Sequence, residues 1–272
     1  MKYYVVSDVH GYYTQMIDSL TKAGFFSETE PHKLIVCGDL MDRGREAEKM
    51  QEFMMDLMEK DQLIFIRGNH EDLMLCMLDD IVDDLTPFLD YRSYHIRNGT
   101  LDTAHQLNHF TLSDFLTHPM DFVFKARQAD FVKNLIPASV NYFETENYIF
   151  VHGFIPCVRI ENSPPRKARY SYIPIMDWRN ASAEQWNAAR WTNGMEAAEI
   201  GNVTIPGKTI VCGHWHASYG HSVIKHRCSE HGPDAIFEPY YGDGIIGIDA
   251  CTAYSGIVNC IVIEDNPLSK ED

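Results

Sequence analysis

The first 82 residues alternate between short apolar runs and longer segments whose apolar residues recur at helical spacing. Strands are predicted at 2–7, 33–38 and 62–68, and helices at 12–25, 45–60 and 71–82. This order constrains the fold strongly, because parallel strands are joined by crossover connections that usually contain a helix. The first part of the chain is therefore expected to form a layered α/β domain with a parallel sheet.

The remainder of the chain is richer in predicted strands than in helices. Strands are predicted at 148–151, 208–213, 244–250 and 256–264, and a helix at 182–190. These strands indicate a second sheet packed on the first. No linker divides the sequence, so residues 1–272 are expected to form one domain with cap-like insertions at about 83–140 and 155–207. The second insertion is predicted to be irregular around its helix.

The composition limits the kinds of partner. The 272 residues carry a net charge of −16. Nucleic-acid binding needs clustered lysine and arginine, and anionic membranes attract basic segments, so both partners are excluded. A small phosphorylated substrate held by metal ions and one or two arginines remains compatible with this charge.

The seven cysteines are an odd number, are scattered, and contain no CxxC pair. They are expected to be free thiols in a reducing compartment. The N-terminus leads directly into a predicted strand rather than into a signal peptide. No apolar run reaches the roughly 18 residues of a membrane helix. The protein is therefore expected to be soluble and cytoplasmic.

Five of the predicted strands end in residues that can bind metal ions. Turns favour Gly, Asn, Asp, Ser and Pro but have no use for His, so the repeated histidines point to a site. The carboxyl ends of parallel strands are also where α/β proteins hold ligands. The candidate residues are Asp8 and His10, Asp39 and Asp42 with Arg43, Asn69 and His70, His152, and His214 and His216.

The donor set mixes carboxylates, imidazoles and an amide. Such a mixture suits Mn²⁺, Fe or Zn²⁺ better than Ca²⁺ or Mg²⁺. Six or seven ligands are too many for one ion with an open position. They suit two ions about 3.5–4 Å apart that share a carboxylate. Asp39 is the natural bridge, because it follows the strand between the other two early motifs.

The motifs "DVHG", "GDLMDRG", "GNHE", "VHGF" and "CGH", in this order, resemble the metallophosphoesterase superfamily. Within it they are most similar to bacterial phosphoprotein phosphatase (PPP) type Ser/Thr phosphatases and to symmetrical diadenosine tetraphosphate hydrolases. The resemblance implies a calcineurin-like β-sandwich flanked by helices, in α/β/β/α layers, with inserted caps. Phe154 replaces the second Gly of the usual "HGG" motif.

The resemblance also implies roles for individual residues. It places one metal ion on Asp8, His10 and Asp39, and a second on Asp39, Asn69, His152 and His214. His216 is either a further ligand of the first ion or a bystander. A bridging hydroxide attacks phosphorus, His70 is the general acid, Asp42 orients His70, and Arg43 binds phosphate oxygens. Arg179 and Arg190 are candidates for a second phosphate-binding arginine, and Arg67 is expected to be structural.

The expected function is a phosphoesterase with two divalent ions per chain, most simply Mn²⁺, that hydrolyses phosphomonoesters of serine or threonine in proteins or of small molecules. One alternative is a symmetrical bis(5′-nucleosyl)-tetraphosphate hydrolase, and another is a catalytically silent binding scaffold. Aromatic residues that could stack on adenine are Tyr91, Tyr94, Trp178, Trp191, Tyr240 and Tyr241. Basic residues that would favour a polyphosphate are Arg159, Arg166, Lys167, Arg169, Arg179 and Arg190. The sequence does not indicate an oligomeric state.

Overall fold

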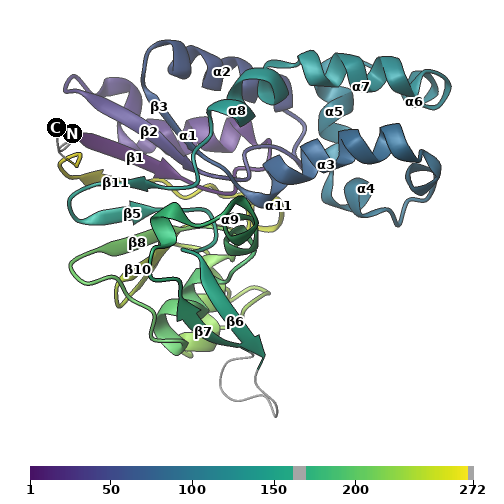
Figure 1. The fold of residues 1–272 in the computed structure, drawn as a ribbon. Helices are drawn as coiled ribbons and strands as arrows, with labels where there is room; N and C mark the ends of the chain where they lie inside the picture. The colour runs from purple at the N-terminus through teal and green to yellow at the C-terminus, as the bar shows by residue number, and fades with distance from the viewer. Residues whose placement is uncertain (162–169, 269–272) are drawn as a thin grey trace.

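Two packed β-sheets form the centre of the protein in the computed structural model, which describes residues 1–161 and 170–268 (Figure 1). The first sheet has the strand order β11-β1-β2-β3. Its strands are β1 (Lys2–Val6), β2 (His32–Cys37), β3 (Leu63–Ile66) and β11 (Ile261–Glu264). β1, β2 and β3 are parallel, as predicted, and β11 pairs antiparallel with β1.

Three helices cover the outer face of this sheet; the first two connect its parallel strands and the third follows the last of them. They are α1 (Tyr13–Ala23), α2 (Ala47–Glu59) and α3 (Asn69–Asp83). The side chains of a strand alternate between its two faces. Tyr4 and Val6 accordingly pack among these helices, whereas Tyr3 and Val5 lie in the core between the two sheets. The predicted β-α-β-α-β-α order is confirmed.

The second sheet has the order β4-β5-β8-β10-β9. Its strands are β4 (Phe143–Glu144), β5 (Tyr148–Phe150), β8 (Thr209–Cys212), β9 (Tyr240–Gly242) and β10 (Ile245–Gly247). Phe150 and Val211 face the first sheet, while Ile149 and Ile210 face a separate core that includes Trp186 of α9 (Ala183–Arg190). The layers are therefore helix, sheet, sheet, helix, as expected.

The region between α3 and β4 is mainly helical and extends to the right in Figure 1, on the side toward which the β1 arrow points. It contains η2 (Thr86–Leu89), α4 (Tyr94–Asn98), α5 (Thr100–Asn108), α6 (Leu112–Thr117), α7 (Pro119–Gln128), η3 (Phe131–Leu135) and α8 (Ile136–Ala138). Its apolar residues belong to the same hydrophobic core as the inward-facing residues of α1, α2 and α3. This region corresponds to the first predicted insertion.

Two expectations about the second half were wrong. The predicted strand 256–264 is shorter, and β11 joins the first sheet, because Ile261 and Ile263 pack into the core between the sheets next to β1. Part of 155–207 is an antiparallel hairpin of β6 (Cys157–Glu161) and β7 (Tyr170–Pro174) rather than irregular chain. The remaining elements are η1 (Phe25–Ser27), η4 (Trp178–Asn180), η5 (Glu196–Ile200), α10 (Ala217–Tyr219), η6 (Gly220–Ile224) and α11 (Thr252–Ser255).

Cys37 and Cys212 are buried in the sandwich, and every cysteine of the chain is a free thiol. Within residues 1–161 and 170–268, no helix combines the length and the apolar character that crossing a membrane requires.

Candidate metal centre

The loops that follow β1, β2, β5 and β8 meet at one edge of the sandwich. The backbone N–H of His10 donates to the carbonyl of Asp39 at 3.0 Å, and that of Gly213 donates to the carbonyl of His152 at 2.8 Å. The backbone N–H of His214 donates to the Asp8 carboxylate across the two sheets at 2.8 Å. The sequence motifs are therefore brought together by the fold.

The backbone of these loops is unusual for residues that carry side chains. A positive φ is found at Asp8, His10, Asp39, Asp42, Arg43 and His214, with values between 50° and 76°. Such conformations are disfavoured for residues other than glycine and concentrate at functional sites. Gly213 allows the closest approach, since a Cβ there would lie 2.0 Å from an oxygen of Asp8.

Asp39 lies at the centre of this edge and belongs to two groups of possible metal ligands. One group is His10, Asp39 and His70, and the other is Asp39, His152 and His214, each with its ligand atoms within 4.8 Å of one another. Asp39 Oδ2 lies 3.9 Å from His10 Nε2, and Oδ1 lies 3.4 Å from His152 Nε2. Its two oxygens thus face different groups, which is the geometry of a bridging carboxylate.

The histidines are oriented by hydrogen bonds from their outer nitrogens. His10 Nδ1 donates to the carbonyl of Met41 at 3.0 Å, and His152 Nδ1 donates to the carbonyl of Cys37 at 2.8 Å. Their Nε2 atoms therefore carry lone pairs that point inward, as is usual for metal-binding histidines. His152 Nε2 lies 2.8 Å from Asn69 Oδ1, so two electron-pair donors face one another.

The protonation states also suit cations. Burial lowers the pKa of His10 and of His214 well below the usual range, so both imidazoles are neutral, as metal binding requires. Burial, reinforced by the charge of Asp39, raises the pKa of Asp8 to about 6. A cation between the Asp8 and Asp39 carboxylates would offset the free-energy cost of burying two negative charges close together. The donor set therefore fits two divalent ions of the Mn²⁺, Fe or Zn²⁺ class.

His70 differs from the other histidines because its outer nitrogen meets a carboxylate. Its Nδ1 donates to Asp42 Oδ2 at 2.7 Å. Thr100 and Thr103 of α5 each donate a hydroxyl to Asp42 at 2.8 Å, which fixes the carboxylate. Burial opposes protonation of His70, but Asp39 and Asp42 outweigh it and raise its pKa to about 9. His70 can therefore hold a proton on the inward-facing Nε2 near neutral pH.

Arg43 is the candidate phosphate ligand that reaches the centre. Its guanidinium donates to His10 Nε2 at 2.7 Å and lies 3.2 Å from His70 Nε2. The planar guanidinium group can donate two parallel hydrogen bonds to two oxygens of one phosphoryl group. The side chain is exposed to solvent.

Two other candidates, Arg179 and His216, are not brought to this centre. Arg179 donates to both oxygens of Glu144 and stacks on Trp178. Glu144 also pairs with Lys208, which precedes β8, so Arg179 lies at the end of that strand opposite to His214. His216 turns away toward Glu230 and His231. These placements argue against the proposed phosphate role of Arg179 and against His216 as a ligand beside Asp39.

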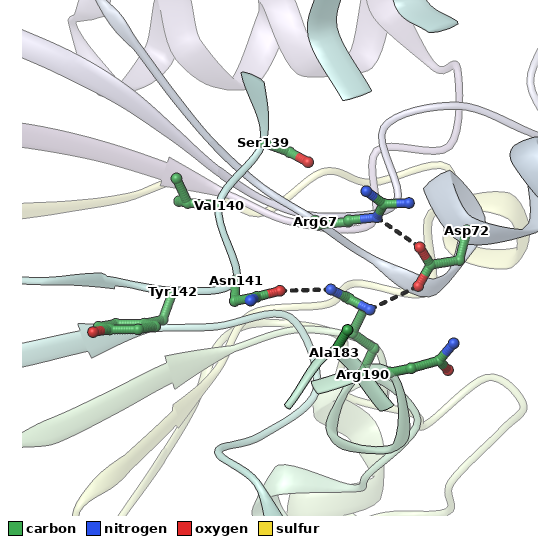
Figure 2. A pocket seen from close by; sticks show the side chains of 9 residues that line it. Arg67, Asp72, Ser139, Val140, Asn141, Tyr142, Ala183 and Arg190 are labelled. Atoms are coloured by element: carbon green, nitrogen blue, oxygen red, sulfur yellow. Dashed lines mark hydrogen bonds and ion pairs between the residues drawn. The ribbon is translucent and has the colours of Figure 1, made fainter. Parts of the chain in front are cut away.

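Arg190 is held by structural contacts rather than facing Arg43. Asp72 receives hydrogen bonds from Arg67 at 2.6 Å and from Arg190 at 2.8 Å, and Arg190 also donates to Asn141 (Figure 2). The cluster borders a cavity of about 710 Å³. Arg67 follows β3 and Arg190 ends α9, so Asp72 connects the two halves of the sandwich. These ion pairs agree with a structural role for Arg67, and they do not support the phosphate role for which Arg190 was a candidate.

Sequence reasoning missed one buried carboxylate, that of Asp249. Asp249 follows β10, and burial together with the charge of Asp8 raises its pKa well above the usual range. The signal was available, because Asp249 is one more acidic residue at a strand end. Glu71 accepts hydrogen bonds from the backbone N–H groups of Gly68, Asp39 and Leu40, so it joins the loops after β2 and β3.

Comparison with known proteins identifies the family. The sequence profile of calcineurin-like phosphoesterases matches residues 1–237, so the chain belongs to that family, whose members are hydrolases that use divalent metal ions. A bis(5′-nucleosyl)-tetraphosphatase PrpE [asymmetrical] of Bacillus velezensis is 33% identical over 76 residues. That match covers 26% of this chain and 30% of the relative, so it spans less than a third of the relative's length.

Two solved structures are similar to the chain at low sequence identity. A cold-active protein-tyrosine phosphatase of a psychrophilic Shewanella is 15% identical, with 97% of this chain and 76% of that chain covered and a TM-score of 0.49. A protein serine/threonine phosphatase of Saccharomyces cerevisiae is 14% identical, with 79% and 61% covered and a TM-score of 0.44. The fold is that of calcineurin-like metallophosphoesterases, as expected from the motifs.

Proposed function

We propose that this protein is a dinuclear metal-dependent phosphomonoesterase of the Ser/Thr protein phosphatase type. The observation that carries the proposal is the placement of Asp39 between two groups of metal ligands, with Arg43 and His70 on the same side. Each component has a separate task in phosphoester hydrolysis.

One ion would be held by Asp8, His10 and Asp39, and the other by Asp39, Asn69, His152 and His214. When bound, two such ions supply a nucleophilic hydroxide near neutral pH and neutralise charge on the phosphoryl group. The residues of the chain provide the orientation. The inward-facing Nε2 atoms of His10 and His152 are fixed by backbone carbonyls, so the ligands need little rearrangement.

His70 would donate the proton that the leaving oxygen needs. Its Nδ1 proton is held by Asp42, so the proton available for transfer is on Nε2, which faces Arg43. Arg43 would bind the oxygens of the phosphoryl group and so bring the leaving oxygen toward His70.

The charges around the centre support a phosphomonoester. Among the three arginines considered for phosphate binding, Arg43 reaches the centre, while Arg179 and Arg190 are paired with carboxylates. A polyphosphate chain would need several cationic side chains. Arg166, Lys167 and Arg169, which would favour such a substrate, lie outside the residues that the structure describes.

A second candidate is hydrolysis of dinucleoside tetraphosphates, the activity that the name of the Bacillus relative gives. Two aromatic side chains beside the centre favour it. The Trp191 ring contacts the His214 ring at 5.6 Å and is 36% exposed. Tyr94 is half exposed, and its pKa is raised mainly by partial burial of the phenol, with smaller effects from the charges of Arg43 and Asp39. Such rings could stack on a base. Trp178 and Tyr240, in contrast, are buried in the core.

The decisive experiment compares kcat/KM of the Mn²⁺-loaded protein for p-nitrophenyl phosphate, a phosphothreonine peptide and diadenosine tetraphosphate. The proposal predicts that the peptide exceeds the dinucleotide by tenfold or more. A higher value for the dinucleotide would replace the proposal with the second candidate. The products would then distinguish symmetrical cleavage to two ADP from asymmetrical cleavage to ATP and AMP.

A pair of variants separates the two substrates further. Trp191→Ala should raise KM for the dinucleotide only if a base stacks there. Tyr241→Ala is the matched control, because Tyr241 is exposed on the edge strand β9. If neither variant changes the ratio of kcat/KM between dinucleotide and p-nitrophenyl phosphate, base stacking on Trp191 is ruled out.

A further inference from the structure

A second cluster of metal-binding side chains lies outside the Asp39 centre. It consists of His216, which follows β8, and Glu230 and His231, which lie in the loop before β9. Their ligand atoms all lie within 4.8 Å of one another. The cluster brings together two segments that are separated by α10 and η6.

Hydrogen bonds fix which nitrogen of His216 faces the cluster. The Ser218 hydroxyl donates its one hydrogen to the carbonyl of Glu230 at 2.8 Å. Its oxygen must therefore accept the hydrogen bond from His216 Nδ1, which lies at 2.7 Å. In the neutral imidazole the remaining nitrogen, Nε2, then carries a lone pair.

That lone pair faces another acceptor. His216 Nε2 lies 3.4 Å from Glu230 Oε1. With a neutral imidazole and an ionised carboxylate, no hydrogen atom lies between the two, so the contact is unfavourable until a cation or a proton occupies the space. Ser218 is fully buried and therefore holds the ring in this orientation.

His231 completes the group from the solvent side. Its ring centroid lies 5.0 Å from that of His216, and it is also packed against the Tyr254 ring of α11. His231 is exposed, while His216 and Glu230 are half-buried. Two imidazoles and one carboxylate leave a fourth position open to water, and this donor set suits Zn²⁺.

We propose that His216, Glu230 and His231 form a third metal site that binds Zn²⁺. The site is separate from the Asp39 centre, because neither group of possible ligands that includes Asp39 contains His216, Glu230 or His231. A bound ion would fasten the loop before β9 to the segment after β8 that carries His214. The competing explanation is an ion pair between a protonated His216 and Glu230, with no metal.

The test counts Zn²⁺ ions on full-length protein that has first been stripped with a chelator. Equilibrium dialysis should give one ion fewer per chain for His231→Gln than for the wild type. His226→Gln is the matched control, since it removes an exposed histidine from the same loop, and it should bind as many ions as the wild type. Equal Zn²⁺ content in the wild type and His231→Gln would overturn the proposal in favour of the ion pair.

Two further variants make the test independent of the Asp39 centre. Asp39→Asn should lose ions from the Asp39 centre but still bind Zn²⁺ at the third site. The double variant Asp39→Asn/His231→Gln should lose ions from both sites. Ser218→Ala should weaken the third site by about 10- to 100-fold, as expected for a residue that orients a ligand. Unchanged affinity in Ser218→Ala would contradict the orientation argued from its hydrogen bonds.

Discussion

His70 occupies its position because α5 supplies two threonines that hold Asp42. Thr103 also accepts a hydrogen bond from the backbone N–H of Asp42 at 3.0 Å, so this residue is fixed at both its backbone and its side chain. The motif "GDLMDRG" predicts Asp42 and Arg43 from sequence. The threonines lie about 60 residues further along the chain, and no local pattern connects them with Asp42.

The first prediction concerns His70 as the general acid. His70→Asn should lower kcat by about 10²- to 10⁴-fold for a phosphoserine peptide, whose alkoxide leaving group needs a proton. The loss should be smaller for p-nitrophenyl phosphate, since its phenolate leaves without one. Metal content should equal that of the wild type. Loss of metal ions in this variant would instead make His70 a ligand, a role that its distance to Asp39 also allows.

The second prediction concerns the pH dependence of the phosphoserine reaction. A general acid must be protonated, so kcat/KM falls as the pH rises through the pKa of His70, which Asp39 and Asp42 raise against the effect of burial. Asp42→Asn removes one of these carboxylates and should move the alkaline limb to lower pH. An alkaline limb at the wild-type pH in Asp42→Asn would show that His70 does not govern it.

At the scale of elements, the strands and helices of the first 83 residues agree with the sequence prediction to within one or two residues. Their apolar periodicity and helical crossovers are local signals. The hairpin of β6 and β7 was missed because most of its side chains are exposed, so it lacks the apolar alternation of a half-buried strand. The pairing of β11 with β1 was also missed, since periodicity does not indicate which sheet a strand joins.

The third prediction concerns the contact between elements that Asp72 makes. Asp72→Asn leaves the guanidiniums of Arg67 and Arg190 facing one another without a counter-charge. We expect the free energy of unfolding to fall by about 1–3 kcal/mol, measured by urea denaturation. Asp90→Asn is the matched control, because it removes an exposed partner of Arg92 and should leave the midpoint unchanged. A wild-type midpoint for Asp72→Asn would mean that the cluster does not hold α9 against β3.

At the scale of the molecule, the proposed metal centre joins the two sheets. Asp8, His10 and Asp39 follow strands of the first sheet, whereas His152 and His214 follow strands of the second. The sequence singled out these residues as candidate ligands because each motif follows a recognisable strand. It did not predict that His216 points elsewhere, since two residues of extended chain place His214 and His216 on the same side, and the positive φ of His214 breaks that pattern.

The fourth prediction is that metal ions stabilise the whole fold. Ions that bind only the folded chain add about 2.7 kcal/mol per site when their free concentration is 100 times Kd. Chelation should therefore lower the Tm of the wild type, and Mn²⁺ should restore it. Asp39→Asn should show a much smaller Mn²⁺-dependent rise in Tm. An equal rise in wild type and variant would indicate that the stabilising ions bind elsewhere.

The most direct test of the account is electron paramagnetic resonance of the Mn²⁺-loaded wild type and Asp39→Asn. A carboxylate shared by two Mn²⁺ ions couples their spins, so the account predicts a spin-coupled signal in the wild type that is absent in Asp39→Asn. Signals of isolated Mn²⁺ only, in fully loaded and active wild-type protein, would contradict the bridging role of Asp39 and with it the dinuclear mechanism.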